Sequence, residues 1–253
     1  AKVANLLNLQ PLDIASVARF APVVSNIVFA ALLKVVYGRF TDNVQLVWAS
    51  LWIFLCANWV GQDYFSPQAL AYALHLAVLA LCLGPLMPQS AHRAFDPLRT
   101  RSRLAQLPPS VSFTPAWLKV GAVFCVAAMI CAIVASHQLT PVILAFSLMG
   151  LSLFTPLSFG YPTIAFLAVV LWISYPAAPF TALYLPGEVA DIGQTIEGVT
   201  DKMVNTSSVG TGVAVVAWAG RALVLLVGLM AFIGWLRRLR HGEPTALICI
   251  LAI

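Results

Sequence analysis

The sequence predicts an all-α protein, a transmembrane bundle whose chain crosses a lipid bilayer about seven times. Of its 253 residues, 61% are hydrophobic and only 9% are charged, and the mean hydropathy is +0.92. Soluble domains carry roughly 25% charged residues, so this chain lacks the polar side chains needed to cover a surface in water. Only helices or a closed barrel satisfy the backbone in lipid. The long continuous apolar runs lack the alternation of barrel strands, which favours helices.

Seven apolar runs are predicted to cross the membrane and to make residues 1–253 a single transmembrane domain. These runs are residues 14–36, 44–61, 69–87, 117–136, 141–158, 162–185 and 210–236. Arg19 and Pro22 interrupt the first run, so a re-entrant or interfacial segment is the alternative there. Pro176 and Pro179 predict a kink near the end of the sixth run.

Four segments lie between or beyond these runs. Residues 1–13 are expected to form a short helix or arm, and 88–116 a basic cytoplasmic loop. Residues 186–209 form an outer connection. Residues 244–253 are apolar but too short to cross alone, so they begin an eighth helix or lie in the interface.

Basic residues predict the orientation, because cytoplasmic loops collect lysine and arginine. Alternating spans place three basic groups on one side of the membrane. They are Arg93, Arg99, Arg101 and Arg103; Lys34 and Arg39; and Arg237, Arg238 and Arg240. The N-terminus is therefore expected outside and the C-terminus inside.

Intramembrane chemistry usually needs ionisable groups inside the spans, and no predicted span has Asp or Glu in its interior. This argues against a proton-relay pump and an intramembrane aspartyl protease. GxSxG, HExxH and P-loop motifs are absent as well. The five cysteines lie in apolar segments without metal-ligand spacing. We therefore expect no enzymatic activity, no cofactor and no metal, and the juxtamembrane position of the basic groups argues against nucleic-acid binding.

His75 is the one histidine well inside a predicted span. A haem between helices usually needs two such histidines. We expect His75 to hydrogen-bond a neighbouring helix, with ligand or partner binding as the alternative.

Arg221 lies about eleven residues into the seventh predicted run, where an arginine costs about 2.5 kcal/mol or more. One interpretation satisfies it with backbone carbonyls facing the bundle interior. The other makes it a binding residue, for an anionic solute or for a carboxylate of a neighbouring subunit.

The outer connection 186–209 carries an apolar stripe with helical spacing. The stripe consists of Val189, Ile192, Ile196, Val199 and Met203. Its opposite face is acidic, whereas helices that lie on membranes are usually basic. The stripe is predicted to dock on a partner, or alternatively to pack on the chain's own bundle.

Residues 187–246 combine this amphipathic segment, a glycine-bearing span, a basic cluster with histidine, a short polar turn and an apolar end. In this quarter the chain resembles small inner-membrane proteins of type IVB secretion and conjugation systems. The resemblance implies a bacterial inner-membrane location and a role inside such an apparatus. The function expected from the sequence is a non-catalytic membrane subunit of a larger assembly, surrounded by lipid and other membrane subunits. The alternative is a transporter of small solutes or lipids with an internal anion site at Arg221.

Overall fold

The computed structural model describes residues 18–41, 43–57, 66–87, 115–137, 139–155, 157–179, 182–183 and 211–241. Seven helices and no strand occur within these residues, which confirms the all-α prediction. The helices are α3 (Ala21–Tyr37), α4 (Val44–Ala57), α5 (Pro67–Leu83), α8 (Ala116–Ser136), α9 (Thr140–Phe154), α10 (Gly160–Ser174) and α13 (Thr211–Arg240).

Each helix overlaps one predicted span, and prolines explain two of the differences. Helix α3 begins at Ala21 with a proline in its first turn, where the missing N–H costs no hydrogen bond. Arg19 therefore precedes the helix. Helix α10 ends at Ser174, before Pro176, because the residue before a proline is disfavoured in the α conformation. The expected kink in the sixth span is thus the end of a helix.

Side chains in the connecting turns fix where three helices start. Asn43 Oδ1 accepts hydrogen bonds from the backbone N–H groups of Gln45 and Leu46, and Ser66 Oγ accepts one from Ala69. His137 Nδ1 accepts one from the Thr140 backbone at 3.2 Å. These bonds satisfy N–H groups that have no partner inside the helix.

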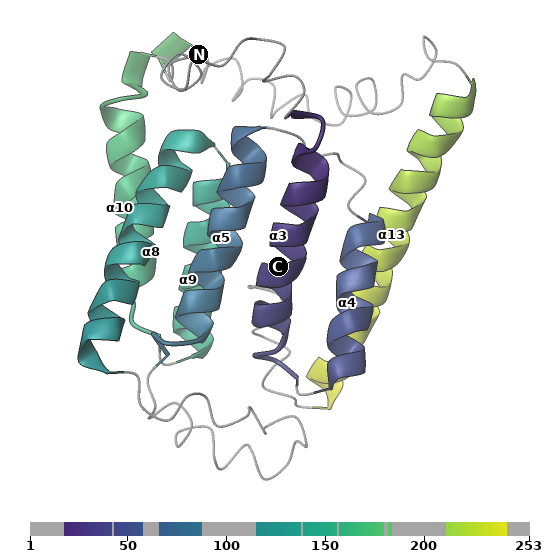
Figure 1. The fold of residues 1–253 in the computed structure, drawn as a ribbon, viewed down its shortest axis with the longest axis horizontal. Coiled ribbons are helices and arrows are strands. Elements are labelled where there is room, and N and C mark those ends of the chain that lie inside the picture. The colour runs from purple at the N-terminus through teal and green to yellow at the C-terminus, as the bar shows by residue number, and fades with distance from the viewer. Residues whose placement is uncertain are drawn as a thin grey trace.

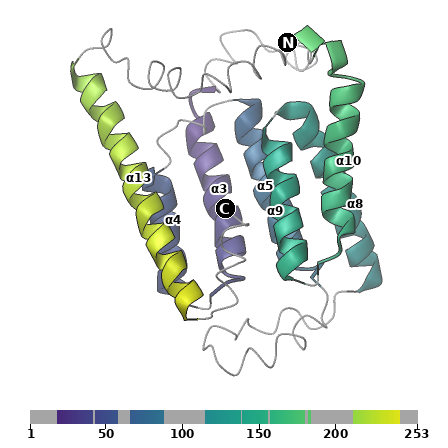
Figure 2. The same ribbon diagram turned by 180° about the vertical axis from the view of Figure 1, so that it is seen from behind.

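The helices stand side by side, with α8, α9 and α10 at one end of the bundle and α13 at the other (Figures 1 and 2). Helix α5 lies in the middle and packs against α3, α8 and α9. Helix α4 packs on α3, and α13 packs chiefly against α4. Helix α13 is therefore the outermost helix on its side.

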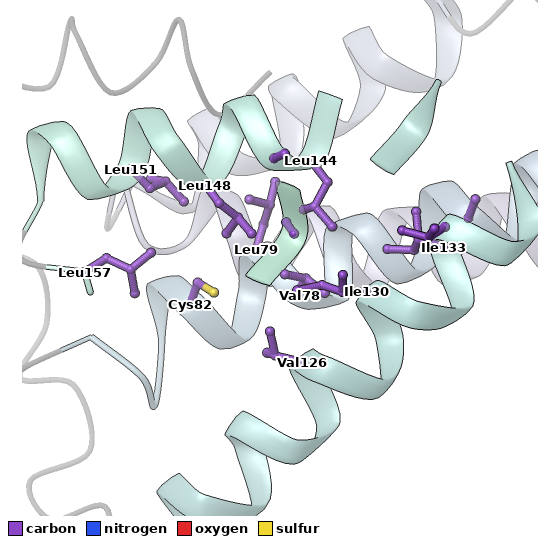
Figure 3. Packing of buried hydrophobic residues seen from close by; sticks show 14 of the residues in the cluster. Val78, Leu79, Cys82, Val126, Ile130, Ile133, Leu144, Leu148, Leu151 and Leu157 are labelled. Atoms are coloured by element: carbon purple, nitrogen blue, oxygen red, sulfur yellow. The ribbon is translucent and has the colours of Figure 1, made fainter. Parts of the chain in front are cut away.

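Two apolar clusters hold the described helices together. The larger is centred on α5, α8 and α9, with single buried residues from α3 and α10, and includes Val78, Leu79, Ile133, Leu144 and Leu148, which are all 0% exposed (Figure 3). The smaller joins α3, α4 and α5, and its members are Phe29, Leu33, Val47, Leu51, Ala69 and Leu76. Dispersion contacts in such close packing stabilise helices even where lipid surrounds them.

Two stretches are long and apolar enough to cross a membrane by length and composition, Trp117–Ser136 and Trp218–Arg237, each of 20 residues. The other five helices are apolar and have 14 to 17 residues. Four predicted segments lie wholly or almost wholly outside the described residues. These are 1–13, the basic loop 88–116, the amphipathic segment 186–209 and the end 244–253.

Candidate functional site

Arg221 lies on α13, the outermost helix, and its side chain is partly buried. Its guanidinium carbon lies 4.9 Å from the centre of the Trp218 ring, one helical turn toward the N-terminus. This cation–π contact is worth about 0.5–2 kcal/mol, more where water is excluded. The side chain follows the general tilt of helical side chains toward the N-terminal end.

Hydrogen bonding of Arg221 is incomplete. Its Nη1 atom is buried and has no hydrogen-bond partner among the described residues. A buried, unpaired N–H of a charged group costs more than a typical hydrogen bond returns. One interpretation of the sequence is that backbone carbonyls of the bundle interior accept hydrogen bonds from Arg221. No such hydrogen bond is made by Nη1 within the described residues.

No carboxylate is available to Arg221 within the described part of the chain, because all nine Asp and Glu residues fall outside it. The charged side chains that are described are all basic. An anionic group from lipid, solute or another protein would accept the hydrogen bond that Nη1 of the guanidinium does not make within the described residues.

His75 lies in the middle of α5 and is 5% exposed. Its Nδ1 atom is buried and has no hydrogen-bond partner among the described residues, so the expected bond to a neighbouring helix is not seen at this atom. The imidazole stacks on the Tyr72 ring, with centroids 6.2 Å apart. Helix α3 stands between α5 and α13 (Figures 1 and 2), so His75 and Arg221 do not share a site.

Reasoning from the sequence missed Trp218 as a site residue and did not single out Trp235 at the other end of α13. Trp218 carries the cation–π contact. Trp235 has a buried Nε1 without a partner among the described residues and a tilted contact with Phe232 at 5.6 Å between ring centroids. Tryptophans that flank an apolar stretch are typical of membrane–water interfaces, and this signal was available in the sequence.

The predicted docking stripe lies outside the described residues. Its members are Val189, Ile192, Ile196, Val199 and Met203. Within the described residues, no three His, Cys, Asp or Glu side chains come together as a group able to hold a metal ion. No protein-family model, curated protein or solved structure matches this chain.

Proposed function

We propose that this protein is a non-catalytic integral subunit of a larger assembly in the bacterial inner membrane. The observation that carries the proposal is the apolar outer surface of the helices. Large apolar side chains point outward on helices all around the bundle, among them Ile27 (65% exposed), Trp52 (65%), Phe124 (71%) and Leu225 (74%). In water such patches would cause association, whereas in a bilayer lipid tails cover them.

Five of the described helices are short for a typical bilayer, and the bilayer would have to adapt to them. Helices of 14 to 17 residues span about 21–26 Å, somewhat less than the roughly 30 Å of hydrocarbon in a typical bilayer. Local thinning and polar flanking side chains accommodate such a mismatch at modest cost.

Basic residues support one orientation. Lys34 lies in the last turn of α3, Lys119 lies in the first turn of α8, and Arg237 and Arg240 lie in the last turn of α13. The corresponding helix ends lie on the same side of the bundle (Figure 1). By the positive-inside rule this side is cytoplasmic.

The role as a subunit is suggested by α13. No residue of the stretch Trp218–Arg237 is fully buried against the described part of the chain, and among the described helices α13 packs chiefly against α4. A helix with so little of its surface covered is available to helices of other subunits. The resemblance of residues 187–246 favours a secretion or conjugation apparatus as the assembly.

The peripheral position of Arg221 favours this role over the transporter alternative. An internal solute site would be enclosed by several helices, whereas Arg221 lies on the outermost helix (Figures 1 and 2).

Site-specific photocrosslinking in intact membranes tests the proposal. A benzophenone amino acid at Leu225 on α13 is expected to crosslink to another integral membrane protein. The same probe at Phe124 on α8, which is similarly exposed, is the matched control and is expected to react mainly with lipid. Crosslinks to lipid alone at both positions would contradict the subunit role, and a product of twice the chain mass would indicate a homodimer.

A further inference from the structure

Helix α13 is longer than a bilayer requires. Its 30 residues extend for about 45 Å at 1.5 Å per residue, against about 30 Å of hydrocarbon. Which 20 residues lie in the hydrocarbon therefore decides how deep Arg221 is.

The basic end of α13 fixes this register. Arg237 and Arg240 occupy the last turn, and charged groups at a helix end stay with the headgroups. Twenty residues counted back from Arg237 reach Trp218, the same stretch that is apolar and long enough to span. Trp218 and Trp235 then lie about 25 Å apart along the axis, one near each interface, as interfacial tryptophans do.

The opposite register is less favourable. With Thr211 at the boundary, the hydrocarbon would end near Met230, and the apolar side chains of Phe232, Ile233 and Trp235 would leave it. The first register leaves out only the smaller side chains of residues 211–217. Because apolar burial scales with area, the first register is preferred.

Arg221 is shallow in this register. Its Cα lies about 4.5 Å inside the boundary at Trp218, and its guanidinium points further toward that boundary, against the Trp218 ring at 4.9 Å. Arginine side chains extend in this way to keep the charge at the interface. Arg221 therefore lies closer to the membrane surface than its position in the apolar run of the sequence indicates.

We infer that Arg221 and Trp218 form a binding site for a phospholipid headgroup phosphate in the leaflet at the Thr211 end of α13. The inference rests on the proposed membrane placement. No described residue supplies a carboxylate for Arg221, and a phosphate in this leaflet lies within reach of the guanidinium. The planar guanidinium can donate two parallel hydrogen bonds to two phosphate oxygens. The cation–π contact with Trp218 restricts the orientation of the guanidinium.

A depth profile tests the register. Nitroxide labels are placed one at a time at the exposed positions Ala222, Leu226, Leu229 and Ile233, with native cysteines replaced, in phosphatidylglycerol vesicles. Oxygen accessibility is expected to peak near Gly228, with Ala222 about 6 Å below the boundary. A peak near Arg221 would overturn the inference but leave the membrane placement intact. Uniform water accessibility along α13 would instead reject the membrane placement itself.

Lipid binding tests the site. Delipidated protein in detergent is titrated with phosphatidylglycerol and, separately, with inorganic phosphate, and bound adducts are counted by native mass spectrometry. Arg221→Leu is expected to lose one bound lipid, because the affinity of this site for phosphatidylglycerol should fall about tenfold. Arg221→Lys should lose less affinity, because lysine keeps the positive charge but lacks the planar guanidinium. Arg240→Leu removes the same charge from the other end of α13 and is the matched control that should retain this adduct.

The other arms separate the possible ligands. Binding of inorganic phosphate at Arg221 without lipid would assign the site to a free anion and overturn the lipid assignment. Equal lipid binding by wild type and Arg221→Leu would also overturn it. So would loss of a copurifying membrane protein from Arg221→Leu without loss of lipid, since this would indicate a partner carboxylate.

Discussion

The ring of Phe29 on α3 meets the ring of Tyr72 on α5 edge to face, with centroids 5.1 Å apart. Phe54 on α4 joins them, edge-on to Phe29 at 6.5 Å and stacked on Tyr72 at 6.3 Å. This aromatic cluster connects three helices. Together with the buried side chains of Val47 and Leu51, it attaches α4 to the rest of the described bundle.

Replacing Phe29 by alanine should therefore destabilise the protein. Phe29 is 1% exposed, and truncation of a buried phenylalanine costs about 3–5 kcal/mol. We expect a lower melting temperature in detergent and a loosened α4. Phe124→Ala removes the same atoms from a side chain that is 71% exposed and should change the melting temperature little. Equal losses from both substitutions would contradict a structural role for the cluster.

Gly84, which follows α5, should not tolerate alanine. An added Cβ would lie 2.9 Å from the Ala80 carbonyl oxygen and 3.0 Å from Arg39 Nη2. The backbone oxygen cannot move without disturbing the end of α5, so a loss of about 1–3 kcal/mol in the free energy of unfolding is expected.

Gly121 is the matched control for Gly84. No atom lies within 4 Å of a Cβ added at Gly121, and this position is inside α8, where alanine is the better helix former by about 1 kcal/mol. Gly121→Ala should leave stability unchanged or raise it. A stable Gly84→Ala protein in the same denaturation assay would show that the close approach is not limiting.

His75→Leu should preserve or raise stability. The substitution removes a buried Nδ1 that has no described partner, and an unsatisfied buried polar group costs about 1–3 kcal/mol. Thermal melting of the purified variant shows whether the substitution raises or lowers the stability of the protein. A clear loss of stability would contradict this prediction and would show that the imidazole makes a stabilising contact within the chain.

Cysteine labelling should divide the helix ends into two sides. Tyr175 follows α10 and is 75% exposed, and Arg240 ends α13 on the other side of the bundle (Figure 2). In intact cells, with native cysteines replaced, an impermeant thiol reagent should label Tyr175→Cys and spare Arg240→Cys until the membrane is opened. Labelling of Arg240→Cys in intact cells would reverse the orientation.

The sequence by itself predicted that the described chain is helical and approximately where its helices lie, because long apolar runs without alternation favour helices over strands. It also singled out Arg221, since a charged side chain in the middle of an apolar run needs a partner or a route to water. Proline positions set helix ends to within a few residues, although Pro176 was expected to kink a helix that instead ends before it.

Only the tertiary structure decided which apolar side chains are inside. Leu144 is 0% exposed and Leu225 is 74% exposed, yet both lie in runs that are apolar on every face. Hydrophobic periodicity marks the buried face of a helix only when its other face is polar, and these runs lack that contrast. The outermost position of α13, and the direction in which Arg221 extends along it, depend on packing between helices distant in sequence and on a side-chain rotamer, which local composition does not specify.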